Sequence, residues 1–242
     1  MNILKFRSQK ELNQAGAGMI IEILQTNPGA VLGLATGGTP VGIYQELAAA
    51  HRQGLVSYAK AAVFNLDEYV GLERGHPESY YSYMQRHLLG KIDIPPKQCH
   101  IPDGMAADLE SECRRYDRVL EEAGPIDLQM LGIGHNGHIG FNEPDEELEH
   151  VTHVVELHEQ TREANARFFG MPEKVPAQAI TMGVGTILKA KRILLVVRGP
   201  DKADIVKRAL QGPVTTKCPA SFLQTHPDVT VLLDTDAGSG LG

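Results

Sequence analysis

The chain of 242 residues contains no tryptophan and only three cysteines, at positions 99, 113 and 218. The cysteines are odd in number, widely spaced and never in a CxxC pair, so they predict neither a disulfide framework nor a zinc site. No apolar run approaches the roughly 20 residues that a membrane-spanning helix needs, and the first residues show no signal-peptide pattern. These absences predict a protein of the reducing cytoplasm without a membrane partner.

Basic residues are also few, and they form no run. Lys and Arg number 23 against 30 Asp and Glu, and the net charge of -7 is spread along the chain. This pattern argues against nucleic acid as a partner, because nucleic-acid binding needs a basic patch or stripe. An anionic ligand would need cations that the fold places locally.

Five short apolar runs alternate with amphipathic stretches. The runs cover residues 30–35, 61–66, 127–133, 193–197 and 229–233. Continuous apolar runs are typical of strands buried on both faces. The stretches between them predict helices over residues 10–26, 41–54, 78–89, 107–123, 160–169 and 201–211. The sequence therefore predicts one α/β domain over residues 1–242, with a doubly wound, mostly parallel sheet and helices on both faces, as in Rossmann-like folds.

In such sheets a ligand lies beyond the carboxyl ends of the strands, so the residues after each run are the candidates for a site. A glycine-rich loop of Thr36, Gly37, Gly38 and Thr39 follows the first run and precedes a helix. Glycines let a backbone approach a ligand closely, and free amides at a helix start bind anions. The loop has neither GxGxxG nor GK[ST] spacing, so it does not indicate a dinucleotide or ATP. A tight turn without a ligand explains the loop equally well.

Two further strand ends carry ionisable side chains. Asp67 and Glu68 follow the second run, where a solvated turn and a catalytic pair are both reasonable interpretations. Glycines flank His138 after the third run, and Glu143 follows it. Backbone freedom suits the placing of an imidazole in a pocket, and a nearby carboxylate can fix its tautomer. His138 is therefore the best acid/base candidate.

Metal-dependent and nucleophilic chemistry have little support. His135 and His138 are three residues apart without an HExxH pattern, so a structural histidine is favoured over a metal ligand. There is no GxSxG elbow, and no cysteine stands beside these motifs. These motifs therefore favour proton-transfer chemistry, without a metal or a redox cofactor.

Taken together, five segments resemble the glucosamine-6-phosphate deaminase family, also called the glucosamine/galactosamine-6-phosphate isomerases. They are residues 34–40 (LATGGTP), 64–72 (FNLDEYVGL), 76–81 (HPESYY), 137–144 (GHIGFNEP) and 221–227 (SFLQTHP). The segments occur in order and cover nearly the whole chain. The resemblance implies conversion of glucosamine 6-phosphate and water to fructose 6-phosphate and ammonia, with no cofactor.

The same resemblance implies roles for single residues. His138 would move the proton that opens the pyranose ring, with Glu143 supporting it. Asp67 would be the general base that carries a proton from C2 to C1 through an enolamine. Arg167 and Lys202 match the family's phosphate-binding cations; without the resemblance, both would be interpreted as surface cations.

Further expectations concern mobility and regulation. Residues 157–178, with Gly170, Pro172 and Pro176, look like the family's mobile lid. Allosteric hexameric members bind an activating sugar phosphate with a Ser, an Arg and a Lys; the aligned positions here are Glu146, His153 and Val155. We therefore expect no activator site, and a monomer or small homo-oligomer.

One candidate catalytic position departs from the family pattern. Asn136 stands two residues before the histidine, where many members have Asp. Its amide can hydrogen-bond to the imidazole or to substrate, but it brings no negative charge to stabilise an imidazolium.

Two alternatives remain. The 6-phosphogluconolactonases resemble this family in fold and phosphate loop, but usually have a DGHTASLFP-like segment where this chain has NGHIGFNEP. A sugar-phosphate sensor would keep the loop and the cations, but it would leave Asp67 and His138 unexplained. Such sensors often carry a helix-turn-helix module, for which the chain has no spare length.

Overall fold

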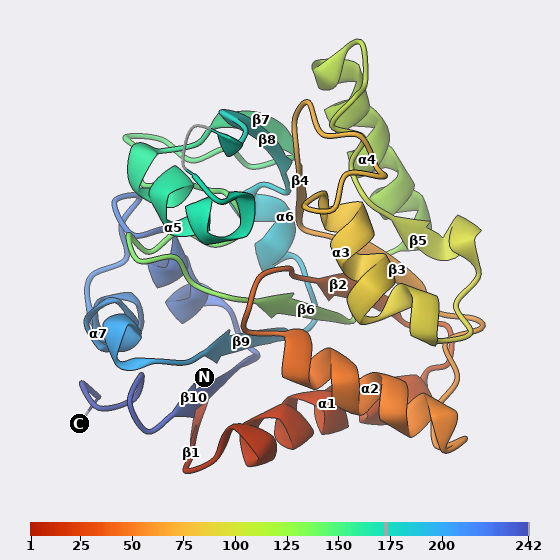
Figure 1. Ribbon diagram of the computed structural model, residues 1–242. Helices are drawn as coiled ribbons and strands as arrows, with labels where there is room; N and C mark the ends of the chain where they lie inside the picture. Colours follow the sequence, from red (N-terminus) through yellow and green to blue (C-terminus); the bar gives the residue numbers. More distant parts are fainter. Residues whose placement is uncertain (172–173, 242) are drawn as a thin grey trace.

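The structure, a computed structural model, describes residues 1–171 and 174–241 and is built around one large parallel sheet (Figure 1). Its seven strands lie in the order β1-β10-β9-β6-β2-β3-β5. Their bounds are Asn2–Phe6 (β1), Val31–Leu34 (β2), Ala62–Asn65 (β3), Cys99–His100 (β5), Leu128–Leu131 (β6), Ile193–Val197 (β9) and Val229–Asp234 (β10). Every strand pair in this sheet is parallel, so the predicted doubly wound sheet is confirmed.

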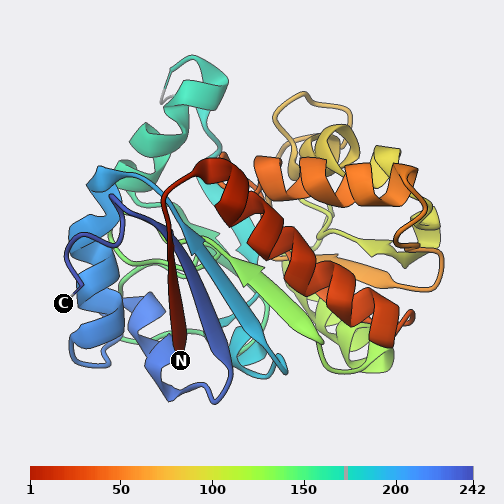
Figure 2. The same cartoon turned by 90° about the horizontal axis from the view of Figure 1, so that it is seen from below.

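Helices cover both faces of this sheet, as Figure 2 shows from below. They are α1 (Gln9–Thr26), α2 (Val41–Arg52), α3 (Tyr80–His87), α4 (Leu109–Ala123), α6 (Val184–Leu188) and α7 (Ala203–Gln211). Helix α5 (Glu159–Phe169) packs instead in a separate, smaller apolar cluster with Tyr69 and Phe141. Successive strand residues point to opposite faces. Leu195 and Val197 of β9 accordingly join the core under α4, α6 and α7, while Leu194 and Val196 join the core under α1, α2 and α3. Because each face of the sheet packs against an apolar core, the strand positions on both faces are mostly apolar, and the runs show no alternation of apolar and polar residues.

A second, antiparallel sheet was not predicted. It contains β4 (Asp67–Tyr69), β8 (Gln178–Thr181) and β7 (His153–Glu156), in that order. The interpretation of Asp67 and Glu68 as the turn after a strand was therefore wrong: β3 ends at Asn65, and Asp67 already pairs with Thr181. No local pattern marks so short a strand, because its partner lies more than a hundred residues further along the chain.

Several predicted helix boundaries also shift. The helix predicted over 78–89 begins at Tyr80, because the hydroxyl of Ser79 accepts a hydrogen bond from the Ser82 amide and caps it. The helix predicted over 201–211 begins at Ala203, after a 3₁₀ turn. None of the helices in the described part of the chain has the length and apolar character that crossing a bilayer requires.

Candidate active site

A cavity of about 200 Å³ opens beyond the carboxyl ends of β2 and β6. The predicted residues that line it are Thr36, Gly37, Gly38, Thr39, Asp67, Asn136, His138, Arg167 and Lys202. Glu143 is the one predicted site residue outside this lining, and its carboxylate lies 3.3 Å behind the His138 ring. Positions from 36 to 202 thus meet at one place, because parallel strands present their carboxyl ends at the same edge of a sheet.

The glycine-rich loop forms one wall of the cavity. Gly37 has a φ of +97°, a conformation that residues with a side chain rarely adopt. Pro40 is the cap residue of α2, whose first residue is Val41. Within residues 1–171 and 174–241, the amides of Gly37, Gly38 and Thr39 donate no hydrogen bond. The loop therefore presents unpaired donors beside the cavity.

Asp67 and Glu68 are neighbours in strand β4, so their side chains point to opposite faces of that strand. Glu68 points away from the cavity and accepts hydrogen bonds of 2.9 Å from the amides of Tyr69, Tyr80 and Tyr81, so it caps the start of α3. Asp67 lines the cavity with only 6% of its surface exposed. Burial, and next the charge of Glu68, raise the pKa of Asp67 to about 8. Only Asp67 of the pair is thus placed to react, and it is a stronger base than an ordinary carboxylate.

His138 is backed by an ionised carboxylate. Its Nδ1 lies 3.3 Å from Oε2 of Glu143, which is 5% exposed. The other oxygen, Oε1, accepts a 2.6 Å hydrogen bond from the Thr161 hydroxyl. Burial alone would raise the pKa of Glu143, but the adjacent imidazole of His138 and the hydrogen bonds from Thr161 and Asn136 hold it at about 2. A negative charge therefore stands behind the imidazole at neutral pH.

Asn136 acts on this pair from the side. We expected its amide to bond to the imidazole or to a substrate. Its Nδ2 donates instead to Oε2 of Glu143 at 2.6 Å, and its Oδ1 accepts from the backbone amide of His138 at 3.1 Å. Asn136 thus fixes both the carboxylate and the backbone that carries the imidazole.

The imidazole occupies the space that a side chain at position 134 would need. A methyl group on Gly134 would lie 2.2 Å from Cε1 of His138, so Gly134→Ala must displace the ring. We expect turnover to fall at least about tenfold, because small misplacements of a reacting group are costly. Steady-state kinetics beside Gly75→Ala, whose added methyl group meets nothing within 4 Å, would measure this. Equal turnover in the two variants would contradict the packing argument.

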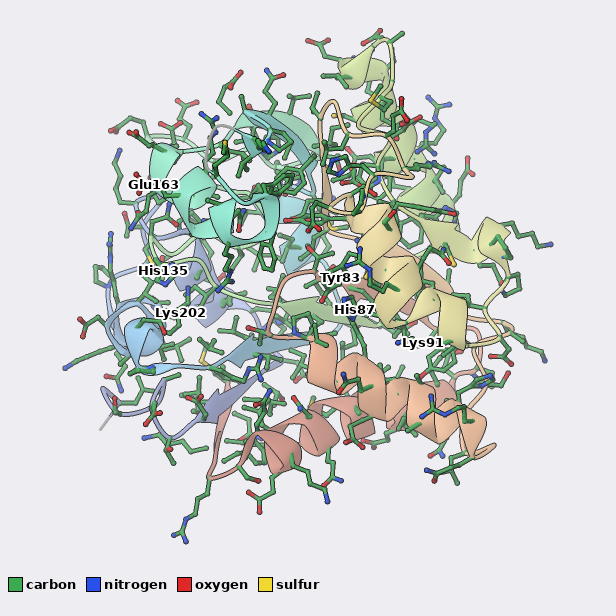
Figure 3. The ribbon with its side chains drawn as sticks, in the orientation of Figure 1. Tyr83, His87, Lys91, His135, Glu163 and Lys202 are labelled. Atoms are coloured by element: carbon green, nitrogen blue, oxygen red, sulfur yellow. The ribbon has the colours of Figure 1, made fainter. Side chains whose placement is uncertain are left out.

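Two cations also line the cavity. Lys202, labelled in Figure 3, donates from Nζ to the carbonyl oxygen of Ile133 at 3.1 Å. Burial lowers the pKa of Lys202 to about 8; Asp201 opposes this shift, and the charge of Arg167 adds to it. Arg167 is exposed in the last turn of α5, with its guanidinium 4.8 Å from the centre of the Phe168 ring. The fold therefore places two positive charges beside the cavity of an acidic chain.

Sequence reasoning missed some lining residues. Tyr80 and Thr161 face the cavity, although no local pattern distinguishes them from other helical residues. His135, which was weighed as a metal ligand, lies 2.7 Å from an Asp201 carboxylate oxygen and is labelled in Figure 3. Across the described ranges, with their gap at 172–173, no three His, Cys, Asp or Glu side chains gather as metal ligands.

Comparison with known proteins gives a consistent result. Residues 7–232 match the family described as glucosamine-6-phosphate isomerases/6-phosphogluconolactonase. The chain is 50% identical over 240 residues to a glucosamine-6-phosphate deaminase of Bacillus velezensis, covering 99% of this chain and 100% of the relative. It is 51% identical over 237 residues to that of a Geobacillus species, covering 98% and 94%.

Solved structures agree. A monomeric glucosamine-6-phosphate deaminase superimposes with a TM-score of 0.97 at 47% identity, covering 99% of this chain and all of that one. A 6-phosphogluconolactonase from Trypanosoma cruzi shares only the fold, with a TM-score of 0.80 at 22% identity over 99% of this chain and 96% of that one. The chain belongs to the family of glucosamine-6-phosphate isomerases and 6-phosphogluconolactonases.

Proposed function

We propose that this protein is an enzyme that converts glucosamine 6-phosphate and water to fructose 6-phosphate and ammonia. One observation carries the proposal: a buried carboxyl group whose pKa is raised to about 8 and a carboxylate-backed histidine face the same cavity as an amide-rich loop and two cations. An aldose-to-ketose shift needs a base near the carbon acid and an acid/base group near the ring oxygen. The deaminases that are about half identical to this chain support the choice of substrate.

The phosphate group would lie against the loop of residues 36–39. The unpaired amides of Gly37, Gly38 and Thr39 offer hydrogen bonds, and α2 adds the positive end of its dipole. Arg167 and Lys202 supply the charge. A phosphate dianion beside Lys202 would stabilise the ammonium form and offset the effect of burial.

Ring opening would be the task of His138. Its imidazole accepts the proton of the anomeric hydroxyl and returns one to the ring oxygen, so the C1–O5 bond breaks as the carbonyl forms. The imidazolium that exists between these transfers is stabilised by Glu143, whose carboxylate stays ionised with its pKa near 2. Asn136 and Thr161 hold that carboxylate in place.

Asp67 would then perform the isomerisation. Its carboxylate removes the proton from C2 of the open-chain sugar, and the enolamine forms. Return of the proton to C1 gives an imine at C2, which water hydrolyses to the ketone and ammonia. A base with a pKa of about 8 suits this step, since abstraction from carbon benefits from a stronger base than an ordinary carboxylate.

Residues 157–178 would act as a lid on the single domain. Helix α5 lies in this segment; Phe169 packs at 5.5 Å between ring centres against Tyr69, and the amide of Asn165 donates to the Tyr69 hydroxyl. Pro172, part of the expected lid, lies outside the described residues. Closure would shield the enolamine and the imine from stray water.

The direct test is ammonia release from glucosamine 6-phosphate, measured beside hydrolysis of 6-phosphogluconolactone above its spontaneous rate. We expect ammonia stoichiometric with fructose 6-phosphate and no accelerated lactone hydrolysis. Lactone hydrolysis without ammonia release would assign the site to the other activity of the family. Binding of both sugar phosphates without turnover would indicate a sensor.

We expect kinetics without activation by N-acetylglucosamine 6-phosphate. At the positions aligned with the activator site, His153 and Val155 stand in β7, and the exposed carboxylate of Glu146 is paired with Lys217. The aligned positions carry neither the Arg nor the Lys of the family's activator site, and the ammonium of Lys217 beside them is already paired with Glu146. Substrate saturation should be hyperbolic and unchanged by the added sugar phosphate, in a monomer like the solved relative. Sigmoidal curves that the activator straightens, or a hexamer by light scattering, would contradict this.

A further inference from the structure

The phosphate loop contains two peptide groups whose orientation its own residues do not fix. Gly37 and Gly38 have no side chain, and a methyl group built on either would meet nothing within 4 Å. Glycine adopts positive and negative φ with similar ease, so the peptide planes on both sides of Gly38 can rotate at little steric cost. An anion is attracted by the N–H end of a peptide and repelled by its carbonyl end. Anion binding here therefore depends on which end faces the cavity.

Two side chains that do not line the cavity donate hydrogen bonds to the carbonyl oxygens of these two peptide groups. The Tyr83 hydroxyl of α3 donates to the carbonyl oxygen of Gly37 at 2.6 Å. The Nη2 of Arg198, the residue after β9, donates to the carbonyl oxygen of Gly38 at 2.9 Å. Neither residue lines the cavity, whereas the loop itself does. Consecutive carbonyls are thus drawn outward by donors from two different parts of the fold.

The trans geometry of the peptide group decides where the N–H groups of Gly38 and Thr39 point. No peptide bond in the described chain is cis, and in a trans peptide the C=O and the next N–H point in opposite directions. The hydrogen bond from Tyr83 to the Gly37 carbonyl therefore turns the N–H of Gly38 away from α3. The hydrogen bond from Arg198 to the Gly38 carbonyl likewise turns the N–H of Thr39 away from Arg198. Both amides lack another acceptor among the described residues, so they are free for a ligand in the cavity.

Tyr83 is itself held in place. Its ring packs at 4.4 Å between centres against His87 of the same helix, and both are labelled in Figure 3. Burial raises the pKa of Tyr83 above its ordinary value, so the hydroxyl keeps its proton throughout the physiological range. A donor that never ionises holds the Gly37 carbonyl at every working pH.

We infer that Tyr83 and Arg198 are positioning residues of the phosphate loop, each fixing one amide toward the substrate's phosphate while touching no substrate atom. The inference rests on the proposed function only in taking that phosphate as the ligand of the loop. It concerns two side chains that the proposed mechanism does not use. We call each of these two hydrogen bonds, from Tyr83 to Gly37 and from Arg198 to Gly38, a clamp. Loss of either clamp leaves the chemistry of Asp67 and His138 in place but lets a carbonyl group turn toward the phosphate.

The first test separates binding from chemistry. Tyr83→Phe removes one hydroxyl and keeps the ring on His87; Arg198→Met removes the other donor, and Arg198→Lys keeps the charge without the guanidinium geometry. We expect the KM of each variant and its inhibition constant for inorganic phosphate to rise in parallel, roughly five- to tenfold, with kcat within about twofold and an unchanged pH profile. Tyr81→Phe, two residues earlier on α3, is the matched control. Unchanged phosphate inhibition in folded Tyr83→Phe and Arg198→Met would overturn the inference.

The second test assigns each clamp to its amide. In ¹⁵N spectra of the wild type, inorganic phosphate should shift the amide signals of Gly38 and Thr39. Tyr83→Phe should weaken the Gly38 response, and Arg198→Met the Thr39 response. Loss of both responses equally in either variant would mean general disturbance of the loop and would refute the inference. This titration needs no turnover, so a wild type that binds phosphate but releases no ammonia would refute the proposed function while still testing the clamps.

Discussion

Asp67→Asn is expected to lower the turnover number for ammonia release at least about a thousandfold while substrate binding is retained. The change keeps the size and shape of the side chain and removes only its ability to accept a proton. General base catalysis contributes about 10²- to 10⁴-fold, and the raised pKa of Asp67 places it toward the upper part of that range. Equilibrium titration with a non-reacting sugar-alcohol 6-phosphate checks binding, and release of ammonia checks turnover. Turnover close to that of the wild type would remove Asp67 from the mechanism.

The same substitution should stabilise the protein at alkaline pH. The pKa of Asp67 is about 8 in the folded protein against 3.8 ordinarily, so the folded state binds this proton more tightly than the unfolded state. The free energy of unfolding therefore falls as pH rises from about 4 to about 8. Asparagine does not titrate, so the melting temperature of Asp67→Asn should exceed that of the wild type by more at pH 9 than at pH 5. An equal difference at both values would mean that folding does not raise the pKa of Asp67.

The sequence predicts the parts of the fold and site that leave a local pattern of apolar or glycine residues, and the family resemblance supplies the roles of others. The apolar runs predict the parallel sheet because strands buried on both faces need apolar residues at every position. The residues that follow these strands then include the loop at Gly37, the carboxylate of Asp67 and the imidazole of His138. Roles for Arg167 and Lys202 come from the family resemblance, since a cation on a helix is ordinarily a surface group.

What the sequence does not predict is set by contacts between distant segments. Asp67 and Glu68 look alike in the sequence, and only the pairing of Asp67 with Thr181 decides which carboxylate faces the cavity. Thr161 donates to Glu143 because α5 lies beside the histidine segment. Both arrangements depend on tertiary packing, which has no local period for a sequence to display.

Glu143→Gln is the second substitution with a large expected effect, because it changes charge and hydrogen bonding together. Both carboxylate oxygens accept bonds, from Asn136 and from Thr161. A glutamine places an NH₂ group where one acceptor stood, so a buried donor meets another donor, at a cost of about 1–3 kcal/mol. The imidazolium also loses its negative partner. We expect turnover to fall about a hundredfold.

The stability of the wild type should depend on this group in the acid range. The pKa of Glu143 is about 2 in the fold against 4.5 ordinarily, so its ionised form contributes roughly 3 kcal/mol above pH 4.5, which is lost as pH falls toward 2. The deficit of Glu143→Gln should therefore be large at pH 7 and small near pH 2. Glu147→Gln, an exposed carboxylate of the same segment, is the control that should show no such dependence.

Deuterium at C2 of the substrate distinguishes the two carboxylates by the step that each controls. Asp67 removes the proton from C2, so its substitution makes this step slower and leaves the isotope effect on kcat/KM at its full size. Glu143 supports the histidine that opens the ring, so Glu143→Gln should make ring opening limiting and reduce the isotope effect toward one. An undiminished isotope effect in Glu143→Gln would mean that its carboxylate assists proton removal from carbon rather than ring opening, and His138 would then lose its separate role.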